Sequence, residues 1–172
     1  MKYGSKARTQ KNSLGKFGLG LKTASSAFCK QFSLISRNSA ESPLNKVQWD
    51  IDYIASNGSW LLQFPTIESD EEDLLEEIAN NNSGTLLVWK KVDRLLKDYK
   101  SISNAQKGLA KIVDSLMFHL SMVFQRFLDF NDERVPNVEI FVNNQSLKPW
   151  DPFCTKEAKT EVLQKEEVPV SM

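Results

Sequence analysis

The sequence contains little cysteine, histidine and glycine, and no long apolar run. Its 172 residues include two cysteines, Cys29 and Cys154, which stand far apart and outside any paired motif, so neither a disulfide framework nor a cysteine-based metal site is predicted. We expect the one histidine, His119, to pack at the edge of the core rather than act in catalysis. Because no stretch is long and apolar enough to cross a bilayer, we expect a soluble, cytoplasmic chain.

The charges are balanced overall but unevenly distributed. Lys plus Arg and Asp plus Glu both number 22, so the formal net charge is zero and gives no general argument for binding nucleic acid or a membrane. The first 40 residues, however, contain no acid; the first is Glu41. A hydrophobic content of 41% suits a globular chain with a core of its own.

The glycines that are present concentrate in one place. Three of the seven, Gly15, Gly18 and Gly20, fall within six residues and lead into a stretch compatible with a helix. Glycine lets the backbone approach a ligand closely, and a helix N-terminus directs free N–H groups and a positive dipole at it, so the pattern favours a phosphate. Neither common phosphate loop matches: Leu21 interrupts the Gly-Lys-Ser/Thr of a P-loop, and Thr23 stands where the dinucleotide fingerprint needs glycine.

The run from Leu14 to Ser25 resembles the second glycine box of the GHKL superfamily, which includes gyrase, the large heat-shock chaperone, histidine kinases and MutL. The residues of this run are most similar to those of MORC-like and bacterial chaperone-type ATP-binding proteins. The resemblance implies that backbone amides wrap the β- and γ-phosphates of ATP and that Lys22 contacts phosphate. The amides concerned belong to Phe17, Gly18, Leu19, Gly20 and Leu21. The alternative is a glycine-containing surface loop ahead of an ordinary helix.

Two later segments bear on the same resemblance. Ser83-Gly84-Thr85 opens a predicted strand, and the resemblance implies that the Thr85 hydroxyl lies near the adenine; the alternative is a helix-capping glycine followed by a strand threonine. Glu76 with Asn80, or Glu77 with Asn81, has the spacing of the family's catalytic Glu-x-x-x-Asn helix. In the family that helix precedes the glycine loop, whereas here it follows, so we interpret the match as coincidental and predict no catalytic residue and no metal ligand.

The hydrophobic pattern predicts helices over 22–30, from 69 to 79 and over 103–128, and strands over 31–37, 85–92 and 138–142. The alternation over 47–53, with Asn57-Gly58 and 60–64, predicts a β-hairpin. Ser69 and Glu72 predict a capping box. Together these elements favour an α+β two-layer sandwich with a mostly antiparallel sheet and helices on one face, as in an incomplete GHKL (Bergerat) fold. We expect a partial ATP-binding domain over 1–153 and a poorly ordered tail over 154–172.

Two motifs that the resemblance places before the glycine loop, Glu-x-x-x-Asn and Asp-x-Gly-x-Gly, do not occur ahead of it in this sequence. They would supply the general base, the Mg²⁺ ligand and the contact to the adenine, so we expect a chain that binds ATP but is inactive in hydrolysis by itself. We expect a homodimer or a second chain that supplies the missing half. The alternatives are a non-enzymatic interaction module with a vestigial nucleotide site and, ranked last, a sensor-kinase-type domain.

Overall fold

The computed structural model describes residues 19–94 and 98–161, which divide into two compact units. Unit 1 extends to Asp98, and unit 2 begins at Tyr99. Phe17 and Gly18, two of the predicted phosphate-binding residues, lie outside the described residues.

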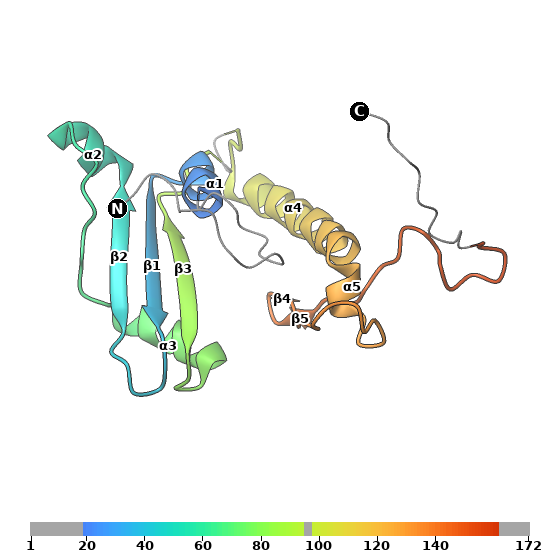
Figure 1. Ribbon diagram of the computed structural model, residues 1–172. Helices are drawn as coiled ribbons and strands as arrows, with labels where there is room; N and C mark the ends of the chain where they lie inside the picture. The colour runs from blue at the N-terminus through green and yellow to red at the C-terminus, as the bar shows by residue number, and fades with distance from the viewer. Residues whose placement is uncertain (1–18, 95–97, 162–172) are drawn as a thin grey trace, which may run out of the picture. The chain divides into compact units, whose positions relative to one another are not determined.

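Unit 1 is built around a three-stranded antiparallel sheet of β1 (Gln31–Arg37), β2 (Asn45–Asp50) and β3 (Gly84–Lys90), in the order β2-β1-β3 (Figure 1). The central strand β1 has the predicted bounds and buries Phe32, Ser33 and Ile35. The α+β class with an antiparallel sheet is therefore confirmed.

Helices contact both faces of this sheet. Helix α1 (Gly20–Phe28) packs on the face that carries Trp89, whose ring stacks on Phe28 at 5.6 Å between centroids. Helix α3 (Ser69–Ala79) packs on the opposite face, where its side chains form ion pairs with Arg37 and Lys46. The alternation of side chains along β1 separates the two sets, because Phe32 and Arg37 point to opposite faces.

The predicted hairpin over 47–64 is wrong, because a helix follows β2. The Asp50 carboxylate accepts hydrogen bonds from the backbone N–H groups of Asp52 (3.0 Å) and Tyr53 (3.3 Å), which caps helix α2 (Ile51–Asn57). Gly58 ends α2 with a left-handed φ of 62°, so it is a C-cap residue and not part of a hairpin turn. The chain then returns along β2 at a single bridge, between Gln48 and Gln63.

The cap of α3 lies one residue earlier than predicted. The Glu71 carboxylate, rather than that of Glu72, reaches back to accept the Glu68 N–H at 3.0 Å. The reason is the orientation of the helix: position 71 faces the sheet and is 1% exposed, whereas Glu72 is exposed.

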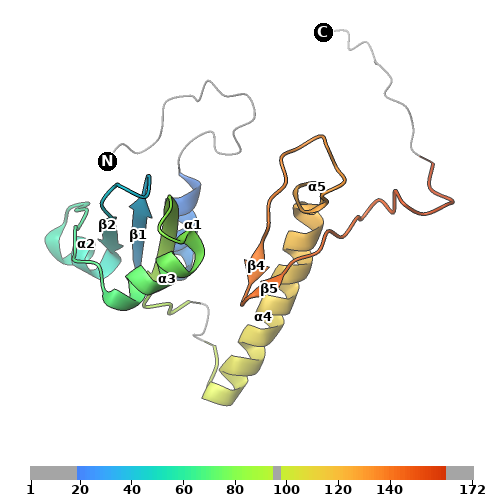
Figure 2. The same cartoon turned by 90° about the horizontal axis from the view of Figure 1, so that it is seen from below.

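Unit 2 consists of a long helix and a short hairpin. Helix α4 (Ile102–Val123) is separated at Phe124 from the single turn α5 (Gln125–Leu128), so the helix predicted over 103–128 is not continuous. Strands β4 (Phe141–Val142) and β5 (Gln145–Ser146) form a short hairpin (Figure 2). The chain turns at Asn143 and Asn144, which both have a positive φ. Although α4 carries the predicted apolar stripe, none of its residues is fully buried.

Within residues 19–94 and 98–161, no helix combines the length and apolar content that crossing a membrane requires.

Candidate functional site

The first turn of α1 presents backbone amides without a side-chain cap. Leu19 occupies the N-cap position and makes no capping hydrogen bond, and the first turn contains no acidic residue. The first N–H groups of any α-helix lack intrahelical acceptors, and the helix dipole places positive potential there. Of the predicted phosphate-binding residues, the structure places Leu19, Gly20, Leu21 and Lys22 together in this turn.

The backbone conformation at Gly20 does not require a glycine. It is helical and has no left-handed φ, and a Cβ added there would meet no atom within 4 Å. The neighbouring Leu21 side chain is 46% exposed. The space beside Gly20 is therefore open among the described residues, and neither helix packing nor backbone strain explains the glycine.

A row of three aromatic side chains, Trp49, Phe32 and Trp89, crosses the sheet beneath α1. Phe32 pairs with Trp49 of β2 and with Trp89 of β3. The Trp89 indole N–H donates to the Ser25 hydroxyl at 3.0 Å, and the Lys22 ammonium lies 5.6 Å from the centroid of a Trp49 ring. This aromatic row fixes the helix that follows the glycine loop.

Cys29 closes α1 as a structural residue. It is fully buried, and its thiol donates to the Ser25 carbonyl at 3.1 Å. Burial raises the pKa of the Cys29 thiol, so the group stays protonated and unreactive near neutral pH.

Thr85 lies on the same face of the sheet as the aromatic row. It pairs with Ser36, and the two hydroxyl oxygens are 2.9 Å apart. Ser36 follows Phe32 by four residues along β1, which corresponds to about 13 Å at 3.3 Å per residue. The predicted phosphate contacts and the predicted adenine contact thus lie on the same face of the sheet and are separated along the direction of β1.

The acid that matches the catalytic spacing is occupied structurally. Glu76 on α3 forms an ion pair of 2.7 Å with Arg37 and accepts the Asn81 N–H, also at 2.7 Å. The hydrogen bond from Arg37 holds the pKa of the Glu76 carboxyl below its usual value. Since α3 covers the face opposite α1, Glu76 lies on the other side of the sheet from the first turn of α1.

A buried ion pair beneath α3 is not predicted by the sequence pattern. The Lys46 ammonium lies 2.5 Å from the Glu71 carboxylate, and both side chains are 2% exposed. Burial raises the pKa of Glu71, but the hydrogen bonds from Lys46 and from the Glu68 N–H outweigh it, so the pKa lies below its usual value. Neither residue type signals burial in the sequence, because Lys and Glu are rarely buried.

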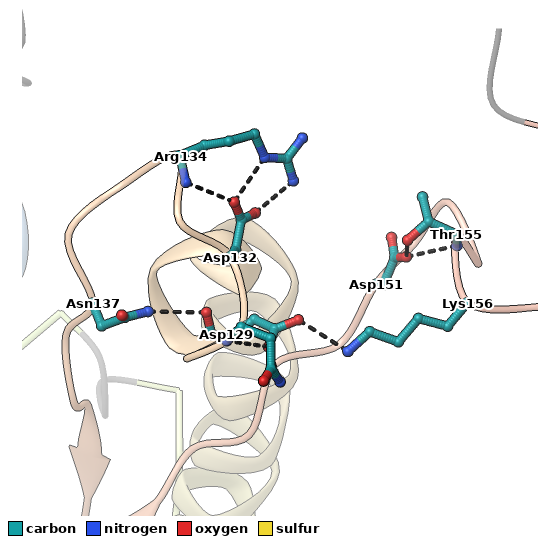
Figure 3. A network of polar contacts seen from close by, with 8 residues as sticks. Asp129, Asp132, Arg134, Asn137, Asp151, Thr155 and Lys156 are labelled. Atoms are coloured by element: carbon teal, nitrogen blue, oxygen red, sulfur yellow. Dashed lines mark hydrogen bonds and ion pairs between the residues drawn. The ribbon is translucent and has the colours of Figure 1, made fainter.

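Unit 2 contains an open cleft of about 290 Å³ at the end of α5, with Trp150 and Phe153 in its lining. Figure 3 shows that its three aspartates are already satisfied: Asp129 by Lys156, Asp132 by Arg134, and Asp151 by Thr155. The hydrogen bonds from Arg134 lower the pKa of Asp132 to about 2. In the described part of the chain, no group of His, Cys, Asp or Glu side chains is placed to hold a metal ion. The network holds the segment after Pro149 against the end of the helix and offers no free ligand set.

Comparison with known proteins supports a class for unit 1. The family described as "Histidine kinase-, DNA gyrase B-, and HSP90-like ATPase" matches residues 1–85, which include the glycine loop, α1 and Thr85. The match supports the GHKL-type ATPase superfamily, of which ATP binding is the common property. The curated proteins and the solved structures gave no match.

Proposed function

We propose that unit 1 binds ATP, with the phosphates at the first turn of α1 and the adenine toward Thr85. The observation that carries the proposal is the uncapped, acid-free N-terminus of α1 directly after a glycine loop, within the span matched by the ATPase family. Gly18, Leu19, Gly20 and Leu21 would offer backbone N–H groups, together with Phe17, and Lys22 would add a positive charge.

The sheet supports the orientation of the nucleotide. Between the aromatic row and the Ser36–Thr85 pair, the same face carries Leu34, Val47 and Leu87, which are apolar and half-buried. An adenine lying over these side chains would have an apolar surface beneath it and the Thr85 hydroxyl at its edge. A triphosphate reaching back toward α1 fits the separation of about 13 Å along β1.

The residues of the glycine loop suggest which members of the superfamily are most similar to the chain. We propose that the chain is nearest to MORC-like and bacterial chaperone-type members of the superfamily. A catalytic base and a Mg²⁺ ligand are not among the residues that we assign, so we propose binding without hydrolysis by this chain, with Mg²⁺ entering together with ATP in a complete domain. A second copy or another chain would supply the remaining groups.

Thermal unfolding with the non-hydrolysable analogue AMPPNP and Mg²⁺ tests the proposal. At a ligand concentration one hundred times Kd, binding stabilises the folded state by about 2.7 kcal/mol, which corresponds to a rise in Tm of roughly 5–10 °C for a chain of this size. Gly18→Val is expected to abolish the shift, because its side chain would occupy the space in which backbone amides approach phosphate. Lys22→Ala is expected to reduce it.

The control is Ser59→Val, at an exposed position that is not among the residues assigned to the site. Its Tm shift with AMPPNP should equal that of the wild type, measured from its own baseline. If the wild type shows no shift, the nucleotide site is vestigial and the non-enzymatic interaction module is the better account. Magnesium-dependent ATP turnover that Lys22→Ala removes would contradict binding without hydrolysis.

A further inference from the structure

We propose that Trp49 is a positioning residue that holds the Lys22 ammonium ready for the terminal phosphates of a nucleoside triphosphate. The proposal rests on the proposed function, because it assigns a role within the same site. It adds a determinant that selects triphosphates over monophosphates, and this determinant lies on β2, more than twenty residues after the glycine loop.

The ring of Trp49 is itself held in place. Trp49 is half-buried on β2 and packs against Phe32, with ring centroids 5.3 Å apart. Phe32 is 6% exposed in the central strand, so it cannot shift without disturbing the core. The Lys22 ammonium 5.6 Å from the Trp49 ring therefore contacts a fixed surface.

The helix that carries Lys22 is fixed on the same row. The Trp89 indole bonds to Ser25, and Phe28 stacks on Trp89, so one end of the row anchors α1 while the other end meets Lys22. A lysine has four rotatable side-chain bonds and about 2 kcal/mol of rotamer entropy. Restricting it over a fixed ring reduces the entropy that phosphate binding would otherwise cost.

The chemistry of the contact suits an anion site. The face of an indole attracts a cation through its quadrupole, but unlike a carboxylate it carries no net charge. The ring contact therefore leaves the charge of the ammonium unchanged. Trp49 thus positions the cation without neutralising it.

The experiment compares dissociation constants for AMPPNP with Mg²⁺ and for AMP in six proteins by calorimetry. These are the wild type, Trp49→Leu, Trp49→Phe, Lys22→Met, the double variant Lys22→Met/Trp49→Leu, and the control Trp60→Leu, a residue that is 82% exposed. Trp49→Leu should weaken the binding of AMPPNP by about two- to five-fold, which corresponds to the loss of a contact worth about 0.5–1 kcal/mol. The affinity for AMP should not change. Trp49→Phe should recover part of the loss, since a benzene ring retains the attractive face.

A merely structural role predicts different results. If Trp49→Leu weakens the binding of AMPPNP and of AMP equally, or if it strengthens the binding of AMPPNP, the proposal is overturned. In the Lys22→Met background, adding Trp49→Leu should cause no further loss of AMPPNP affinity; a full additional loss would also overturn it. Trp60→Leu should match the wild type in every measurement.

Failure of the proposed function would be recognised separately. If the wild type binds no AMPPNP, the Tm values of the single and double variants of Lys22 and Trp49 still report on the contact. Decreases in Tm that are less than additive would show that the two residues interact even though no nucleotide is bound. In that case the proposed nucleotide site would be wrong, but the contact between Lys22 and Trp49 would stand. Fully additive decreases would overturn the positioning role itself.

Discussion

At the scale of single residues, a buried ion pair of unit 1 lies outside the motif that suggested a function. Lys46 and Glu71 form a buried ion pair, and Glu71 also accepts the Glu68 N–H at the start of α3. Its second oxygen has no hydrogen-bond partner among the described residues and lies 3.5 Å from the Lys90 ammonium. One carboxylate therefore links β2, β3 and the beginning of a helix.

We predict that Glu71→Gln destabilises the protein by about 3–5 kcal/mol, because it leaves the Lys46 charge buried without a counter-charge. Urea unfolding followed by tryptophan fluorescence measures this loss. Glu72→Gln, one position along and exposed, is the control and should change stability by less than about 0.5 kcal/mol. A loss as small as that of the control would show that the pair contributes little.

The same carboxylate predicts a pH dependence. Because the folded pKa of Glu71 is below its ordinary value of 4.5, its contribution is fully present above about pH 4.5 and is lost as the pH falls through the folded pKa. Below pH 4.5 the wild type should therefore lose stability more steeply than Glu71→Gln. Parallel curves for the two proteins in urea titrations at successive pH values would contradict this assignment.

Gly20 gives a residue-scale test of the proposed ligand site. In the free protein, Gly20→Ala should not destabilise the fold and should stabilise α1 by up to about 1 kcal/mol, because its Cβ meets no atom within 4 Å. We nevertheless expect weaker AMPPNP binding, since the methyl group would enter the space of the phosphates. Thermal unfolding with and without AMPPNP separates these effects, and an unchanged nucleotide shift would remove Gly20 from the site.

At the scale of elements, the packing of α3 on β3 depends on a glycine. A Cβ at Gly84 would lie 2.8 Å from the Ala79 Cβ and 3.2 Å from Leu75 Cδ1. In the sequence Gly84 belongs to a predicted nucleotide motif, whereas in the structure its direct consequence is a close helix–strand contact. Thr85, the next residue, points to the other face.

We predict that Gly84→Ala destabilises unit 1 by about 1–3 kcal/mol, the usual cost of overpacking. The Ala79 side chain cannot yield, because its Cβ is attached directly to the helix backbone. Ser83→Ala, at an exposed neighbouring position, is the matched control. Equal Tm values for the two variants would mean that α3 shifts without cost.

Most elements of unit 1 could be predicted from the sequence, but their contacts could not. The bounds of β1 follow from its pattern, whereas the alternation that ends at Tyr53 conceals α2. Asp50 as an N-cap and Gly58 as a C-cap were available signals for that helix. The Lys22–Trp49 contact depends on strand register and on the placement of α1, which no local pattern encodes.

At the scale of the whole molecule, the described chain has two compact units with different kinds of surface. The sheet of unit 1 carries the proposed nucleotide site, whereas unit 2 contains a cleft whose aspartates are bound to its own side chains. Trp150 connects the segment after β5 to α4. Its backbone N–H donates to the Ser121 carbonyl, and its ring contacts Phe118.

We predict that Asp129→Asn has a small effect on global stability, within about 1 kcal/mol, because its partner Lys156 is exposed. Hydrogen exchange should become faster in residues 153–157, which the Asp129–Lys156 pair helps to hold, and remain unchanged in α1. Faster exchange throughout unit 1 would instead show that the network stabilises the whole chain.

The most direct test of the central claim is to follow the backbone amides of the isotopically labelled chain by NMR during titration with AMPPNP and Mg²⁺. We predict that the largest chemical-shift changes occur at the amides of Leu19, Gly20, Leu21 and Lys22, and that AMP shifts them much less. Large changes confined to the unit 2 cleft, or none in the first turn of α1, would contradict the account.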